Sequence, residues 1–257
     1  CNNGQSLQQA NPNSVQLIIT IEGAHALCNG SDTLNAMNWY KVEDRIKEMK
    51  AWDYPPFFIM FAHHFYNGLC TQAKSLFDIS GKLLDQDLGT RDYEHEPLDS
   101  ITSPIQDLGL TVIRGLLSQK NGRRVLIDVK HMSLDARKQY YQLLKTEYRG
   151  ETIPVICSHG ALAIEKEKNF YYHQVNMELE TDIQIIYETG GLIGIEMDQR
   201  ILGYNKNRFW KSVAKIFNNQ DKQNFIEAGY FWNQVIRIAE YAYQHQFQAD
   251  PWQCICL

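Results

Sequence analysis

Short apolar runs alternate with longer amphipathic stretches along the whole chain. Six of these runs lack polar alternation and are rich in β-branched or aromatic residues. They are Leu17–Glu22, Phe57–Ala62, Val125–Val129, Ile153–Cys157, Leu192–Glu196 and Cys254–Leu257. Runs of this kind are typical of parallel strands buried on both faces of a sheet. The pattern therefore predicts a parallel sheet.

The stretches between the runs carry apolar residues at helical spacing. Helices are predicted over residues 38–51, 103–122, 133–148, 179–188 and 227–246. In the second of these, Ser103 is a candidate N-cap, Pro104 suits the first helical position, and Gly122 is a stop signal. Ser133 is a candidate cap for the third. An alternation of strands and helices is the signature of an α/β fold.

The number of strands leaves the architecture open. A closed barrel of alternating strands and helices needs eight strands, and this chain supplies six. The fold is therefore either an open sheet or part of a longer barrel. We expect residues 1–257 to form a single, partial βα-barrel domain with a polar tail at residues 1–14. The polar segments 78–102 and 203–224 are expected to be loop insertions.

Composition narrows the function classes. The net charge is −5 over 257 residues and no Lys/Arg cluster carries interleaved aromatic residues, which argues against a nucleic-acid partner. No apolar run reaches the ~18 residues of a transmembrane helix. The compartment stays open: Cys1 is a candidate lipidation site of a periplasmic or membrane-anchored lipoprotein, and a cytoplasmic location is the alternative. Cys157 and Cys256 lie in apolar runs, so they are expected to be buried thiols.

Acidic and imidazole side chains follow the first four runs, at the point where each run ends. These groups are Glu22 with His25, His63 with His64, Asp128 with His131, and His159. The C-terminal ends of parallel strands form the ligand-binding face of α/β folds, and in a barrel they converge. The sequence therefore predicts a site at this face.

Three of these residues form a candidate metal-ligand set. Glu22, His131 and His159 would supply one carboxylate and two imidazoles, which is a catalytic zinc set with an open position. A polar cluster at the end of a sheet is the alternative interpretation of the same three residues.

Four stretches carry a resemblance to a known family. They are "TIEGAH" (20–25), "AHHFYN" (62–67), "LIDVKHMS" (126–133) and "PVICSHGA" (154–161). In this order they resemble motifs of the membrane dipeptidase (renal dipeptidase) family of the amidohydrolase superfamily. "GGLIGIEMDQRIL" (190–202) resembles the next strand of that family. The resemblance covers roughly residues 15 to 257.

The resemblance implies a (βα)8 TIM-like metallo-hydrolase barrel that holds two zinc ions at the strand C-termini. It implies that Glu22 bridges both metals and that His131 and His159 complete one of the two metal sites. His64 matches the family's catalytic histidine, which binds the substrate and steadies the oxyanion, and Asn67 lies in the same motif. His63 is the adjacent alternative. Lys168 is the nearest match to the arginine that holds the substrate carboxylate.

The sequence also departs from the family pattern. Lys130 stands where the family usually has a serine before its first ligand histidine. No His-x-Asp pair precedes Glu22, and the aspartate expected after the last strand would fall beyond Leu257. We therefore expect that the sequence lacks both ends of a longer gene product and supplies strands three to eight of the barrel.

The resemblance implies a zinc-dependent dipeptidase that hydrolyses small peptides with a metal-activated water and is catalytically incomplete in this chain. One alternative is a non-catalytic relative with a one-metal or metal-free pocket. Another is a hydrolase of the same superfamily that acts on lactones or phosphoesters. The resemblance also implies a possible homodimer.

Overall fold

The fold is that of a computed structural model of the chain. It describes residues 13–15, 17–28, 38–63, 66–73, 103–163, 175–198, 201–202, 220–247 and 250–256. The chain divides into two compact units, Cys1–Tyr140 and Tyr141–Leu257. Named strands pair in parallel within each unit, and helices separate them along the chain, so the α/β prediction is confirmed. The predicted insertion at 78–102 lies outside the described residues. Residues 203–219 of the predicted insertion at 203–224 also lie outside them.

The strands of the first unit bring three predicted runs together. Strand β1 (Phe58–Met60) pairs in parallel with β2 (Leu126–Asp128). The run that ends at Glu22 lies on the other side of β1, where Ile21 forms a parallel bridge to Ile59. The prediction of a buried strand over this run is wrong, because Leu17, Ile18 and Ile19 are exposed and Ile21 forms an isolated bridge instead of a strand. The Ile21 N–H donates to the Phe58 carbonyl over 3.1 Å, and the Met60 N–H donates to the Ile21 carbonyl over 2.8 Å. All three runs therefore end on the same side of this sheet.

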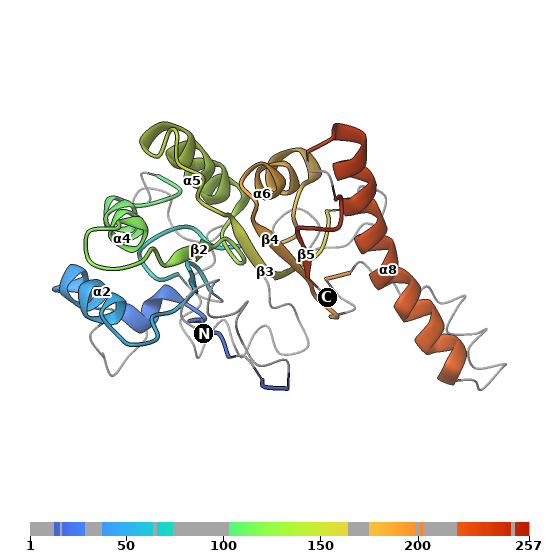
Figure 1. The fold of residues 1–257 in the computed structure, drawn as a ribbon, viewed down its shortest axis with the longest axis horizontal. Coiled ribbons are helices and arrows are strands. Elements are labelled where there is room, and N and C mark those ends of the chain that lie inside the picture. The colour runs from blue at the N-terminus through green and yellow to red at the C-terminus, as the bar shows by residue number, and fades with distance from the viewer. Residues whose placement is uncertain are drawn as a thin grey trace. The chain divides into compact units, whose positions relative to one another are not determined.

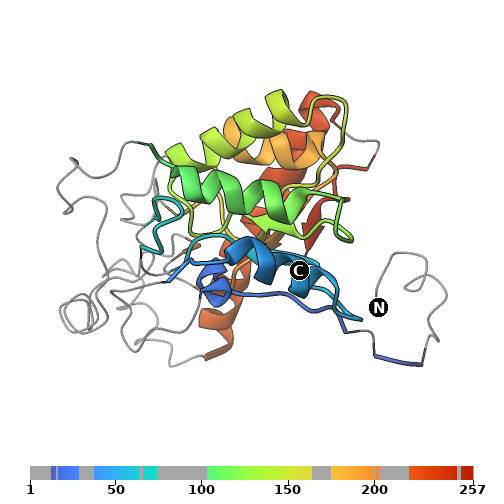
Figure 2. The same cartoon turned by 90° about the vertical axis from the view of Figure 1, so that its left-hand side faces the viewer.

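Helices α2 (Val42–Lys50) and α4 (Asp107–Leu117) pack against each other in the same unit, and α4 also packs on β2 (Figures 1 and 2). The side chain of Lys50 is buried at this contact. Its Nζ donates to the carbonyls of Gly115 (3.2 Å) and Leu116 (3.3 Å) in the last turn of α4. A lysine at this position donates to carbonyls that have no partner within the helix, and it interacts favourably with the negative end of the helix dipole.

The start of α4 corrects one prediction. Helix α4 begins at Asp107 with Gln106 as its N-cap, so the assignment of Ser103 as cap and Pro104 as first helical residue is wrong. The chain before Asp107 is instead paired with residues 69–71. The Thr71 N–H donates to the Pro104 carbonyl over 2.8 Å, and Ile105 bridges Cys70 in antiparallel fashion. This pairing holds the segment extended and delays the helix.

Helix α5 (Leu134–Glu147) agrees with its prediction. The Ser133 Oγ accepts a hydrogen bond from the Ala136 N–H over 3.2 Å, which is the geometry of an N-cap side chain, so the predicted cap is confirmed.

The second unit contains β3 (Ile156–Gly160), β4 (Leu192–Ile195) and β5 (Ile255–Cys256), paired in that order. The π-helical segment η3 (Leu179–Ile183) continues into α6 (Gln184–Glu188), and α8 spans Gln220–His245. Helices α6 and α8 both pack on β4 (Figure 1).

Two predictions about cysteines have different outcomes. Cys157 is buried, as expected, whereas the prediction for Cys256 is wrong because that residue is exposed. Cys256 belongs to a strand of only two residues, in which neither side chain is fully buried. Among the described residues, no helix is both long and apolar enough to span a membrane.

Candidate functional site

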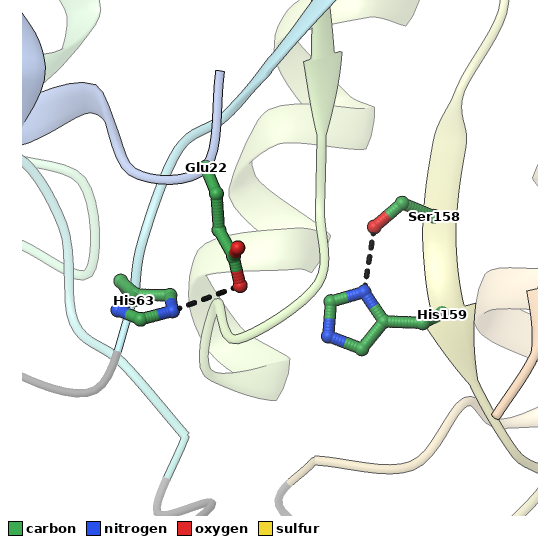
Figure 3. Close-up of polar contacts among 4 residues, drawn as sticks. All are labelled: Glu22, His63, Ser158 and His159. Carbon is green, nitrogen blue, oxygen red and sulfur yellow. Dashed lines mark hydrogen bonds and ion pairs between the residues drawn. The ribbon is translucent and has the colours of Figure 1, made fainter. Parts of the chain in front are cut away.

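The strand ends of the first unit place three predicted side chains next to one another. Glu22 directly follows Ile21, His63 follows β1 and His131 follows β2. The Glu22 Oε1 lies 3.1 Å from the His63 Nε2 (Figure 3). The rings of His63 and His131 meet edge to face with their centroids 5.2 Å apart. These residues come from three neighbouring strand segments, so the convergence depends on the sheet and not on sequence proximity.

His25 joins this cluster through a tight turn. It lies in the 3-10 helix η1 (Ala24–Leu27), and its ring centroid is 6.2 Å from that of His63. Gly23 precedes the helix with a φ of 101°. A Cβ on Gly23 would lie 2.1 Å from the Cε1 of His25. Only glycine therefore allows both this backbone conformation and this position of the ring.

Exposure differs strongly across the cluster. His131 is 3% exposed, whereas the side chains of His63 and Glu22 are 20% and 63% exposed. Burial, with a smaller contribution from the charge of His63, lowers the pKa of His25 below its usual value of 6.5. His25 therefore contributes a neutral imidazole at pH 7.

The lowered pKa of His25 predicts a specific loss of stability in acid. The unfolded chain takes up the His25 proton more readily than the folded chain, so this contribution is complete above about pH 6.5 and is lost as the pH falls through the folded pKa. We expect His25→Gln to reduce the difference in urea midpoint between about pH 7.5 and about pH 5.5. His245→Gln, in which an exposed histidine of α8 is replaced, is the control. Equal pH dependence in all three proteins would contradict the prediction.

The turn after β2 holds His131 in an uncommon conformation. His131 has a φ of 66°, in the left-handed region that non-glycine residues seldom occupy. The Lys130 N–H donates to the Asp128 Oδ1 over 3.0 Å, and the Ala73 N–H donates to the His131 carbonyl over 2.7 Å. Asp128 and Lys130 are 0% and 1% exposed. These bonds fix the backbone that presents His131.

The predicted substrate-binding residues are described only in part. His64 and Lys168 lie outside the described residues. Asn67 is 2% exposed; its Nδ2 donates to the Phe61 carbonyl over 2.8 Å and its Oδ1 accepts from the Leu69 N–H over 3.0 Å. Both bonds join parts of the loop after β1, so Asn67 shapes the segment that carries His63.

His159 belongs to the second unit, near the end of β3. Its Nδ1 lies 2.8 Å from the Oγ of Ser158, the residue before it (Figure 3). Ser158 was not predicted as a site residue, since a serine in an apolar run carries no signal of its own. His63 was only the alternative to His64, because both directly follow the same strand.

The donor set has the right chemistry for zinc. Carboxylate oxygen and imidazole nitrogen are ligands that zinc takes in proteins. Within the described part of the chain, however, no group of three or more His, Cys, Asp or Glu side chains is arranged to hold a metal ion. The contact of Glu22 with His63 thus shows which donors lie together in the first unit, not a formed coordination shell.

Comparison with known proteins adds no assignment. No family model matches the chain, and no curated protein matches it. The functional argument therefore rests on the residues themselves.

Proposed function

We propose that this chain forms part of a zinc-dependent dipeptidase built on a (βα)8 barrel and is catalytically incomplete by itself. The observation that carries the proposal is the contact of Glu22 with His63, and of His63 with His131, at the ends of three neighbouring strand segments. Parallel strands with intervening helices are consistent with a barrel. The ordered resemblance of four motifs to the membrane dipeptidase family supports the choice of reaction.

Each donor has a role in this proposal. Glu22, His131 and His159 would hold zinc, with Glu22 placed to bridge a second ion. When bound, zinc would polarise the scissile carbonyl and make water more acidic. The fixed turn around His131 limits the backbone freedom that would be lost on binding, because hydrogen bonds to Asp128 and Ala73 already hold the backbone.

The remaining imidazoles would handle the substrate. The Glu22 Oε1 accepts a hydrogen bond from the His63 Nε2–H and so orients the His63 ring. We assign to His63 or His64 the stabilisation of the oxyanion that forms on the scissile carbonyl. Lys168 would attract the carboxylate of the dipeptide as a point charge, without the bidentate fork of an arginine.

A non-catalytic relative is the second candidate. It agrees with the departures of the sequence from the family's metal-ligand pattern, since no His-x-Asp pair precedes Glu22. Lys130, the residue before His131 in the sequence, is buried. A lysine beside a proposed ligand opposes the binding of a cation there.

Zinc binding and peptide hydrolysis separate the two candidates. We expect the purified full-length gene product to contain zinc by mass spectrometry, and to hydrolyse dipeptides in a reaction that a chelator stops and added zinc restores. His131→Ala should remove both properties, whereas substitution of the exposed His245 of α8 by alanine should leave both unchanged. Zinc uptake without hydrolysis of dipeptides would favour the non-catalytic relative, and hydrolysis of lactones or phosphoesters instead would redefine the substrate. A protein that contained no zinc and showed no activity would overturn the proposal.

A further inference from the structure

Strand β3 contains an irregularity next to His159. Cys157 is paired with Ile193 and Gly160 with Ile195, so three steps along β3 match two steps along β4. The extra residue is the signature of a β-bulge. In a regular strand, neighbouring side chains point to opposite faces of the sheet. The bulge allows Ser158 and His159 to reach each other, and the Ser158 Oγ lies 2.8 Å from the His159 Nδ1 (Figure 3).

The neighbouring strand is fitted to this bulge. A Cβ on Gly194 of β4 would lie 2.1 Å from the Ser158 carbonyl oxygen and 3.0 Å from its carbon. Both atoms belong to the backbone, so neither can move aside alone. Beyond the bulge, the Glu196 N–H donates to the Gly160 carbonyl over 2.8 Å and resumes the pairing. Gly194 therefore lets β4 pack directly against the segment that carries Ser158 and His159.

We propose that Ser158 is a positioning residue for His159. Its Oγ lies within hydrogen-bond distance of Nδ1, so a metal held by His159 would be bound through Nε2. A histidine that coordinates through Nε2 carries its proton on Nδ1, and Ser158 Oγ then accepts that hydrogen bond. Such a bond fixes both the tautomer and the orientation of the ring before the metal arrives. The inference rests on the proposed function for the identity of the metal, but the hydrogen bond itself does not.

Two variants of Ser158 test this role. Ser158→Ala removes the hydroxyl, and we expect the zinc affinity to fall about 10- to 100-fold. Ser158→Thr keeps a hydroxyl on a residue suited to strands, and we expect it to stay within about threefold of the unaltered protein. Affinity is measured by competition with a zinc indicator. The tautomer of His159 is measured in the metal-free protein from the ¹⁵N chemical shifts of the ring, assigned by comparison with His159→Gln.

The two measurements have separate consequences. A changed tautomer population in Ser158→Ala, restored in Ser158→Thr, supports the positioning role, because a merely structural serine would not change the ring nitrogens. An unchanged tautomer and an unchanged zinc affinity in a folded Ser158→Ala protein would overturn it. If Ser158→Ala does not fold, Ser158→Cys, a weaker hydrogen-bonding partner, decides the same question. If the unaltered protein binds no zinc, the proposed function fails, and the tautomer measurement alone decides the role of Ser158.

Discussion

Glu22→Gln should lower kcat/KM for dipeptide hydrolysis by at least about a hundredfold, a loss typical of removing one preorganised electrostatic group from an active site. The amide matches the carboxylate in size, so packing around it is preserved. It carries no negative charge, and it is a poorer ligand for zinc. The group that faces the His63 Nε2 would change from a charged carboxylate to a neutral amide. The measurement is the steady-state rate together with the zinc content.

A matched control separates this effect from a general change in charge. Glu240 is an exposed residue of α8, and Glu240→Gln removes the same charge at a residue that has no role in the proposal. We expect Glu240→Gln to leave both the activity and the zinc content unchanged. If Glu22→Gln behaves like Glu240→Gln, then Glu22 has no part in catalysis or metal binding.

Strands β1 and β2 could be predicted from the sequence because each lies within an uninterrupted apolar run. The runs at Phe57–Ala62 and Val125–Val129 contain β1 and β2, which form a parallel pair with Ile59 opposite Ile127. Both isoleucines are fully buried. A strand buried on both faces has no polar face, and that requirement is visible in the residues themselves.

The start of α4 could not be predicted because it depends on a distant segment. Ser103 and Pro104 are favourable signals for a helix start, yet the backbone there pairs with residues 69–71. Local preferences of this kind amount to about 1 kcal/mol, and hydrogen bonds to another segment outweigh them. The bulge in β3 is similar, because its position depends on the fit of Gly194 to Ser158.

The candidate site was predicted at the level of strand ends and not of contacts. His131 follows the buried strand β2, as the sequence predicted. The apolar run before Glu22 also reaches the sheet, through the bridge of Ile21 to Ile59, but Leu17, Ile18 and Ile19 are exposed and not buried. The contact of Glu22 with His63 was not predicted; His63 was only the alternative to His64 as the catalytic histidine, and ring positions depend on the loop held by Asn67. His25 was placed with Glu22 at the end of the first run, but its ring contact with His63 was not predicted. The available signal was Gly23, whose missing side chain makes room for the ring.

Gly109→Ala should lower the free energy of unfolding by about 1–3 kcal/mol, the usual cost of overpacking a core. Gly109 is buried in α4, where a Cβ would lie 2.2 Å from the Leu69 carbonyl oxygen and 2.9 Å from the Cγ2 of Ile105. Leu69 belongs to the segment 66–73, whose Ala73 N–H donates to the His131 carbonyl. Displacement of this segment should therefore also speed hydrogen exchange at the Ala73 amide. Urea unfolding and amide exchange measure the two effects.

Gly229→Ala is the matched control, since it makes the same change in another helix with the opposite expected sign. Gly229 lies inside α8, is exposed, and would place its Cβ where no atom lies within 4 Å. Alanine there reduces the entropy lost on folding, so stability should rise by about 0.5–1 kcal/mol. If both substitutions stabilise the protein, α4 does not pack against Leu69 as closely as the structure has it. The packing of α4 on residues 66–73 would then not be tight enough to hold the backbone of His131. A metal ligand is preorganised only where its backbone is held, because this limits the entropy lost on binding.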